Sequence, residues 1–163
     1  MITTRPAKIE DAPLLTALIR ELAAYDRLSE EASVIEDDVV RDGFGATPKF
    51  RVVIAESGSD VAGYALFFPF YSSFQGHEGL FMDDIFVRHA FRGHGVGEAL
   101  LGHVAQVALR EGYFCVRCEM LEWNQPAIEF CSKEGAVFLE EWKAAMFIGD
   151  ALQAAASKAN PKQ

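Results

Sequence analysis

Hydrophobic positions along the chain follow two periodicities, which predict strands interleaved with helices. Apolar residues recur at helical spacing from Leu14 to Tyr25 and again along one side of residues 95–111. Residues 50–56 and 61–70 are apolar and β-branched or aromatic, and a Ser-Gly-Ser-Asp turn divides them, which is typical of a hairpin. The expected strands cover 2–5, 50–56, 61–70, 79–87, 113–121, 136–139 and 144–148. The expected helices cover 11–25, 36–41 (stopping at Gly43), 95–111 and 126–133.

This order of elements predicts an α/β fold with one mixed sheet. The early strands pair as an antiparallel hairpin, and the strand, helix and strand that begin at residue 79 form a β-α-β crossover. We find no internal repeat and no linker in the 163 residues. We therefore expect a single domain over residues 1–150, followed by an Ala-rich tail over 151–163.

The charge balance narrows the possible partners. The chain has 15 Lys and Arg against 24 Asp and Glu, a net charge of −9 at pH 7. This total does not favour the basic face that a polyanion needs, so we expect no nucleic-acid partner and favour a small cationic molecule. The first residues are charged where a signal peptide needs an apolar run, and no stretch approaches the roughly 18 to 20 apolar residues of a membrane helix. We expect a cytoplasmic protein with no membrane partner.

The cysteines do not indicate a metal or a disulfide framework. Three cysteines cannot all pair with one another, which argues against a secreted disulfide-rich protein. Cys115 and Cys118 form a C-x-x-C, but within an expected strand residues three apart face opposite ways. We therefore expect buried thiols and no metal site.

A glycine-rich segment between the fourth strand and the long helix carries the strongest chemical signal. The sequence R-G-H-G-V-G, residues 92–97, opens the helix, where backbone N–H groups can converge on an anion and the helix dipole adds partial positive charge. Arg88, His89, Arg92 and His94 gather here without an intervening acid. The pattern therefore indicates either a phosphate site or a tight turn that merely needs glycine.

Two common phosphate motifs do not fit this segment. No Gly-Lys-Ser/Thr follows the glycines, which excludes a P-loop. Glu98 stands where the third glycine of a dinucleotide fingerprint belongs. The spacing instead resembles the R/Q-x-x-G-x-G/A pyrophosphate loop of the GNAT superfamily of acetyl-CoA-dependent N-acetyltransferases.

The resemblance extends over nearly the whole chain up to about Ile148 and is closest to the diamine (spermidine/spermine) branch. The matching segments are Arg5-Pro6-Ala7, Glu21 to Tyr25, Asp42-Gly43-Phe44-Gly45, the Asp83-Asp84 strand, Trp123 to Ile128 and Gly135-Ala136. It implies the GNAT fold, with a mixed, mostly antiparallel twisted sheet and helices on both faces. It also implies direct transfer of acetyl from acetyl-CoA to a primary amine, no metal, and a homodimer.

The resemblance assigns residues to the coenzyme site. The strand 85–87 offers backbone hydrogen bonds to the pantetheine arm, the loop wraps the pyrophosphate, and the helix that follows residue 124 flanks the arm. The coenzyme-binding residues expected in this way are Ile85, Phe86, Val87, Arg92, Gly93, His94, Gly95, Val96, Gly97, Glu98, Asn124, Pro126, Ala127, Cys131 and Lys133.

Asp83 is the candidate catalytic base by the same resemblance, accepting the amine proton directly or through water. The pair Asp83-Asp84 is also unusual on physical grounds, since burying two carboxylates is unfavourable unless they are hydrogen-bonded or meet a cation. Strand alternation sends the two to opposite faces. A solvated strand end or a structural hydrogen bond is the alternative role for each.

Cys131 departs from the family pattern, because it occupies the position of a tyrosine that protonates the departing CoA sulfur. Three readings are open: Cys131 donates the proton, water or another tyrosine donates it, or CoA leaves unassisted as a thiolate. A thiol is a weaker hydrogen-bond donor than a phenol. We favour water or unassisted departure, with Cys131 lining the coenzyme site.

Acceptor recognition is also assigned by resemblance, since carboxylates and an aromatic face suit an alkyl polycation. The expected acceptor residues are Tyr25, Asp26, Asp83, Glu119, Glu141 and Trp142. The function predicted is acetyl transfer to a small diamine, polyamine or lysine-like amine. The alternatives are another acceptor (an amino acid analogue, an aminoglycoside-like amine or a protein N-terminus) or a non-catalytic acyl-CoA-binding module.

Overall fold

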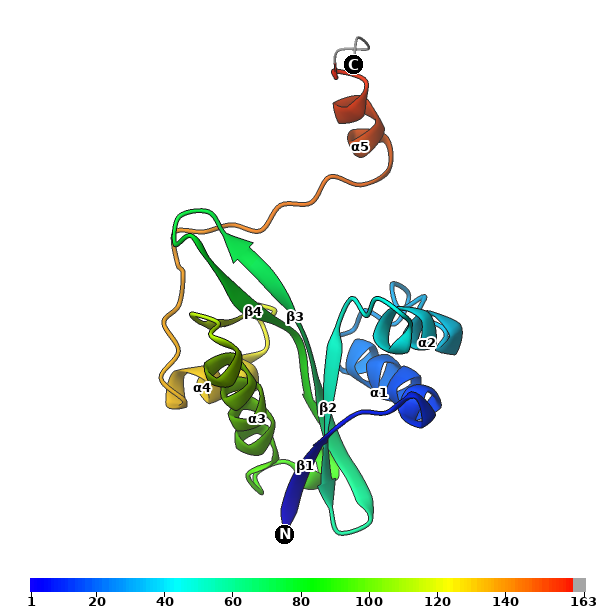
Figure 1. The fold of residues 1–163 in the computed structure, drawn as a ribbon, viewed down its shortest axis with the longest axis vertical. Helices are drawn as coiled ribbons and strands as arrows, with labels where there is room; N and C mark the ends of the chain where they lie inside the picture. The colour runs from blue at the N-terminus through cyan, green and yellow to red at the C-terminus, as the bar shows by residue number, and fades with distance from the viewer. Residues whose placement is uncertain (160–163) are drawn as a thin grey trace. The chain divides into compact units, whose positions relative to one another are not determined.

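The computed structural model describes residues 1–159, and its centre is a five-stranded sheet in which spatial order follows chain order (Figure 1). The first four strands pair antiparallel, and the fifth runs parallel to the fourth. The strands are β1 (Ile2–Pro6), β2 (Arg51–Ser57), β3 (Asp60–Ser72), β4 (His77–Val87) and β5 (Val116–Cys118). The predicted mixed, mostly antiparallel sheet is thereby confirmed.

Helices cover both faces of this sheet, also as expected (Figure 1). The helices are α1 (Ala12–Tyr25), α2 (Glu36–Phe44), α3 (Val96–Glu111), α4 (Gln125–Lys133) and α5 (Gly149–Ala156), with 3-10 turns at Ile9–Asp11 and His89–Phe91. On one face, Leu15 and Leu18 of α1 pack with Ile54 and Tyr64 of the sheet. On the other face, α3 packs against β2, β3 and β4.

The central strands are apolar on both sides because both of their faces are covered. Successive residues of β2 alternate between the two cores, with Val53 on the α3 side and Val52 and Ile54 on the α1 side. This explains why the sequence here reads as a continuous apolar run and not as apolar-polar alternation. By internal contacts the chain divides into two parts, Met1–Glu129 and residues 130 onward.

Two predicted boundaries are wrong. The second helix does not stop at Gly43 but continues to Phe44, and Gly43 lies against the Phe50 ring: a Cβ there would lie 2.8 Å from Cε2 of that ring. The strand expected over 113–121 covers only Val116–Cys118. Before it the chain is still leaving α3, since the N–H of Tyr113 donates to the carbonyl of Ala108 at 2.9 Å.

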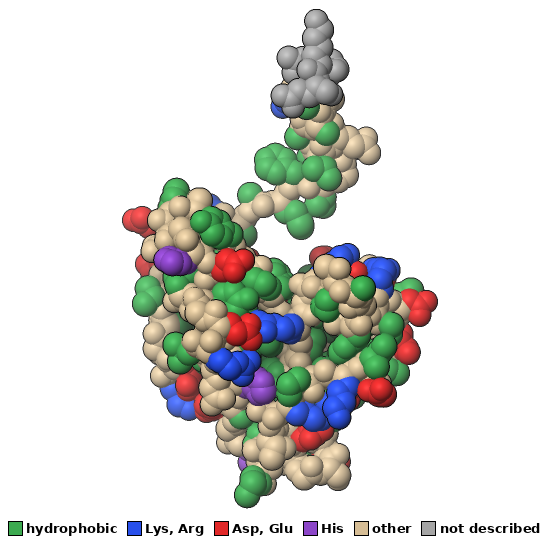
Figure 2. Space-filling model, viewed as in Figure 1, with side chains coloured by type: hydrophobic (Ala, Val, Ile, Leu, Met, Phe, Trp, Pro, Cys, Tyr) green, Lys and Arg blue, Asp and Glu red, His purple; other side chains and the backbone are tan. Residues whose placement is uncertain are grey.

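The predicted closing pair of strands, 136–139 with 144–148, is also wrong: none of these described residues lies in a strand. Apolar residues of the segment face solvent, Val137 with 86% of its surface exposed and Met146 with 80%, and Figure 2 shows hydrophobic side chains along this part of the chain. Apolar sequence indicates a tendency to be buried, but a strand also needs a neighbour to pair its N–H and C=O groups. The last residues of the predicted tail, 160–163, lie outside the described part.

Within residues 1–159, no helix combines the length and the hydrophobicity that crossing a membrane requires.

Candidate active site

The loop before α3 has the geometry of an anion site. Gly93 and Gly95 have φ angles of +75° and +82°, the left-handed region that glycine adopts without penalty. The first hydrogen bond of the helix runs from the N–H of Ala99 to the carbonyl of Gly95, at 3.0 Å. The N–H groups of residues 96–98 come before it and are not used by the hydrogen bonds within the helix. A Cβ added at either glycine would meet nothing within 4 Å. The loop therefore has both the room and the donors that a diphosphate needs.

The expected basic cluster does not face this loop as a unit. Arg88 is paired with Glu21 of α1, with its Nη2 2.6 Å from one carboxylate oxygen and its Nε 2.9 Å from the other. Arg92 donates through Nε to the carbonyl of Val87 at 3.0 Å, and its guanidinium lies 4.3 Å from the centre of the Tyr25 ring. Arg92 thus ties the end of β4 to the end of α1.

Several residues expected on the coenzyme and acceptor sides meet around Tyr25. The Tyr25 hydroxyl donates to Oδ1 of Asn124 at 3.3 Å. Its ring packs against Phe86 and Trp123, with centroids 6.5 and 6.2 Å away. The same Asn124 oxygen accepts from the N–H of Ala127 at 3.3 Å, at the start of α4. These residues bring α1, β4 and the loop before α4 together.

A β-bulge in β4 corrects the expectation that Asp83 and Asp84 face opposite ways. Asp84 pairs with Leu66 of β3 and Met82 pairs with Phe67, so Asp83 is the extra residue of the ladder. A bulge interrupts side-chain alternation. Asp83 and Asp84 therefore line the same cleft.

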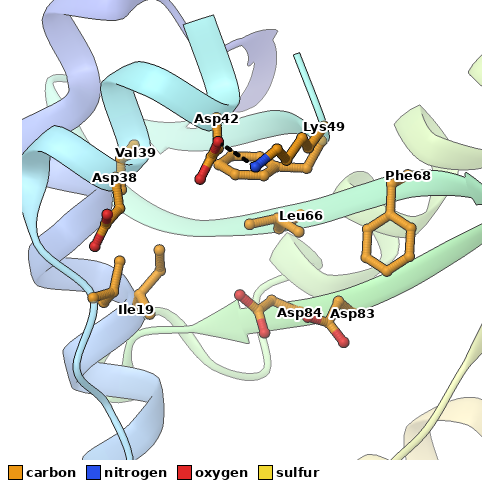
Figure 3. A pocket seen from close by; sticks show the side chains of 11 residues that line it. Ile19, Asp38, Val39, Asp42, Lys49, Leu66, Phe68, Asp83 and Asp84 are labelled. Carbon is orange, nitrogen blue, oxygen red and sulfur yellow. Dashed lines mark ion pairs between the residues drawn. The ribbon is translucent and has the colours of Figure 1, made fainter. Parts of the chain in front are cut away.

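This cleft has a volume of about 560 Å³, within the range of small-molecule sites. It lies among α1, α2, the segment that follows α2, and strands β3 and β4 (Figure 3). Its lining residues are Ile19, Val34, Asp38, Val39, Asp42, Lys49, Phe50, Leu66, Phe68, Asp83 and Asp84.

Asp84 is largely buried and bonded to a buried tyrosine. Its Oδ2 accepts a hydrogen bond of 2.8 Å from the hydroxyl of Tyr64. Burial raises the pKa of Asp84 to about 6, an effect that the Tyr64 bond opposes and that the charges of Asp83 and Asp26 reinforce. Burial also raises the pKa of Tyr64, which keeps its hydroxyl protonated as the donor.

Asp83 is exposed at the bulge, in contrast to Asp84. Partial burial raises its pKa, and the charge of Glu119 adds to this. Glu119 in turn pairs with Arg117, with an Nη2-to-Oε1 distance of 3.1 Å. Burial also raises the pKa of Asp26, whose Oδ1 is buried and has no hydrogen-bond partner among the described residues. The charges of Asp26 and Asp83 thus act on Asp84, and the charge of Glu119 acts on Asp83.

The remaining expected residues lie from α4 onward. Pro126 is the second residue of α4 and is exposed, and Cys131 is buried, with 7% of its surface accessible. Lys133, Glu141 and Trp142 are exposed. The roles assigned to these residues stay predictions.

The predicted site omits polar residues that the structure places in or beside the cleft, among them Asp38, Asp42, Lys49 and Tyr64. Asp42 could have been found from the sequence, because it belongs to a segment that matches the family. Asp38 and Lys49 belong to no such segment. From the sequence alone, Tyr64 is typical of an aromatic residue that packs in the core from a strand. Only the fold shows that its hydroxyl meets Asp84.

Comparison with known proteins agrees with this fold. The model of the Acetyltransferase (GNAT) family matches residues 15–136. A solved structure of an integron cassette protein of V. cholerae superposes with a TM-score of 0.79 at 22% identity, covering 96% of this chain and 98% of its own. Fold and sequence together define an N-acetyltransferase. The chain belongs to the GNAT acetyltransferase family.

Its relatives correspond to the expected diamine branch. The chain is 34% identical to a thialysine N-epsilon-acetyltransferase of Bos taurus, over 96% of this chain and 98% of the relative. It is 32% identical to a spermidine/spermine N(1)-acetyltransferase-like protein 1 of Homo sapiens, over 83% of this chain and 20% of that longer protein.

Proposed function

We propose that this enzyme transfers acetyl from acetyl-CoA to a primary amine of a small diamine, polyamine or lysine-like acceptor, in the cleft beside β4. The observation that carries the proposal is the bulge that turns Asp83 and Asp84 into one cleft. No lysine or arginine of the described residues contributes to the pKa of either carboxylate. An acceptor ammonium supplies the missing cation, which offsets the unfavourable burial of these charges.

The loop before α3 fits the diphosphate of the coenzyme. Gly93 and Gly95 leave open space on its outer side, and a side chain at either position would occupy that space. The backbone of 85–87 and the loop 92–98 would hold acetyl-CoA, with Asn124, Pro126 and Ala127 on the other side. When bound, acetyl-CoA supplies the activated thioester that the acceptor nitrogen attacks.

Asp83 takes the proton of the acceptor amine. An alkyl ammonium resembles lysine, with a pKa of about 10.4, so roughly one molecule in a thousand or fewer is the free amine at pH 7. A carboxylate beside the amine favours the charged form, so the base also needs a path that removes the proton. Asp83 is exposed and can pass its proton to water, whereas Asp84 is largely buried.

Cys131, which the family resemblance assigns to the coenzyme site, is not the proton donor in this proposal. Its burial supports a packing role. The coenzyme thiol then leaves with a proton from water, or unassisted as a thiolate. No metal takes part in the proposed reaction.

We also infer that the enzyme acts as a homodimer in the cytoplasm. The dimer is supported by the family resemblance and by the exposed apolar residues of the segment 137–148. Large exposed apolar patches are uncommon on monomers and mark contact surfaces.

An amine panel with acetyl-CoA tests the proposed function. The assay measures release of the CoA thiol with putrescine, spermidine, lysine, an aminoglycoside and a peptide N-terminus as acceptors. We expect saturable release that depends on the added amine, with the first three preferred. Coenzyme binding without turnover on any amine would instead support the acyl-CoA-binding module. A preference for the aminoglycoside or the peptide N-terminus would show that the acceptor belongs to another class of amine.

A further inference from the structure

Tyr64 is a core residue of β3 that carries one polar atom. None of its surface is exposed, and it packs with Leu15 and Leu18 of α1. Its ring also packs against Phe86 of β4, with the ring centroids 6.3 Å apart. A phenylalanine would fill the same space, so packing alone does not require the hydroxyl. A buried phenol is favourable only where its hydroxyl has a hydrogen-bond partner.

The partner of this hydroxyl is a carboxylate of the acceptor cleft. Asp84 lies two residues before Phe86, the β4 residue that pairs with Tyr64. The hydroxyl donates to Oδ2 of Asp84 at 2.8 Å. No other group within residues 1–159 donates a hydrogen bond to this carboxylate. Asp84 lines the cleft, so its second oxygen, Oδ1, is left to a ligand.

The ionised groups that act on Asp84 all have the same sign as its own charge. Burial raises the pKa of Asp84, and the charges of Asp83 on β4 and of Asp26 after α1 raise it further. The hydrogen bond from Tyr64 acts in the opposite direction, because a donated hydrogen bond stabilises the ionised form of a carboxylate.

The other charged residues that line the cleft are paired with one another or with a neighbour. Lys49 Nζ lies 2.7 Å from Oδ1 of Asp42 (Figure 3), and Oδ1 of Asp38 lies 2.9 Å from the Arg41 guanidinium. None of these charges contributes to the pKa of Asp84. Within residues 1–159, the phenol is therefore the one group that favours the ionised form of this carboxylate.

We propose that Tyr64 is a positioning residue of the acceptor site, whose hydroxyl holds Asp84 as an oriented anion for the acceptor ammonium. This inference rests on the proposed function. The two carboxylates then have different roles: the exposed Asp83 takes the proton of the reacting nitrogen, and Asp84 binds the cation. Tyr64 thereby sets the lowest pH at which the cleft binds an amine.

Tyr64→Phe tests the inference, because it removes the hydroxyl and keeps the ring. The pKa of Asp84 should rise from about 6 by roughly one unit, the effect expected of losing a hydrogen bond to a charged group. At pH 6, kcat/KM for the best amine should then fall about fivefold relative to the unaltered enzyme, mainly through KM. At pH 9 Asp84 is ionised in both enzymes, and the difference should be less than about twofold. Comparing the enzymes at each pH cancels the ionisation of the amine itself.

Two further variants separate this role from a structural one. Tyr113→Phe removes a hydroxyl on the α3 side of the sheet, outside the cleft, and should keep the pH profile of the unaltered enzyme. Asp84→Asn leaves no charge for Tyr64 to stabilise, so adding Tyr64→Phe to it should cause no further pH-dependent loss. Melting temperatures establish that all variants are folded.

Urea unfolding reports the same ionisation without catalysis. The pH window in which the free energy of unfolding falls with rising pH should end near pH 6 in the unaltered enzyme and about one unit higher in Tyr64→Phe. An unchanged window in the variant would show that the hydroxyl does not act on Asp84, and would overturn the inference.

The kinetic outcomes separate this inference from the proposed function. If Tyr64→Phe keeps the kcat/KM of the unaltered enzyme at pH 6, or loses as much on the Asp84→Asn background, the role of Tyr64 is overturned and the proposed function stands. If the folded enzyme acetylates no amine, the proposed function fails, and the role of Tyr64 in acceptor binding fails with it.

Discussion

Asp84 is a single residue whose buried charge lowers the stability of the fold. Its pKa is raised from 3.8 to about 6 by burial, whereas in the unfolded chain it ionises at its usual value. Between these pH values the folded protein binds more protons than the unfolded chain, so the free energy of unfolding falls as pH rises through this window. At 1.36 kcal/mol per pKa unit, the raised pKa lowers the free energy of unfolding above pH 6 by about 3 kcal/mol.

Replacing Asp84 by asparagine should therefore stabilise the enzyme. Asp84→Asn keeps an oxygen that accepts the Tyr64 hydrogen bond and removes the buried charge. We expect a free energy of unfolding higher by about 1 to 3 kcal/mol at pH 8, and a gain that shrinks as pH falls toward 4. Urea unfolding at the two pH values measures this. A variant equally stable or less stable at pH 8 would show that the charge of Asp84 carries no penalty.

At the scale of elements, α3 and the loop before it form the proposed coenzyme site. Gly95→Asp should abolish acetyl-CoA binding, because it places a side chain and a negative charge in the open space beside the N-terminus of α3. Calorimetric titration measures the affinity, and we expect a loss of at least a hundredfold.

The other end of the same helix supplies a matched control. Gly112 follows α3 with a φ of +81° and also has open space at its Cβ position. Gly112→Asp imposes the same backbone strain, and its negative charge at the helix C-terminus is unfavourable for stability. It should nevertheless bind acetyl-CoA normally. Equal losses in both variants would attribute the effect to strain and not to the coenzyme site.

Elements with strong periodicity could be predicted from the sequence, and so could the loop. Helices α1 and α3 and the hairpin of β2 and β3 follow directly from apolar spacing and turn residues, and R-G-H-G-V-G marks the loop through its glycines. The β4 bulge leaves no such mark, because register depends on the neighbouring strand. The ion pair between Lys49 and Asp42 and the ion pairs of Arg41 with Asp38 and Asp42 were not predictable either, because only the fold brings these side chains together.

At the scale of the whole molecule, the segment 137–148 is the feature that the monomer does not explain. Val137→Asp changes a residue that is 86% exposed, so in a monomer it should be nearly neutral. If the segment forms the proposed dimer contact, the charge should raise the dimer dissociation constant at least tenfold, as measured by sedimentation equilibrium. Leu109→Asp, at an α3 residue that is 81% exposed, is the control and should leave association unchanged. A monomeric unaltered enzyme would refute the proposed dimer.

In the proposed reaction, Asp83 takes the proton of the acceptor amine in the cleft beside β4. The most direct measurement is therefore the turnover of Asp83→Asn with its best amine, beside the affinity of the same variant for acetyl-CoA. We predict a fall in kcat of at least a hundredfold, the usual range for loss of a general base, with coenzyme affinity unchanged within about twofold. A folded variant that keeps full turnover would contradict the central claim.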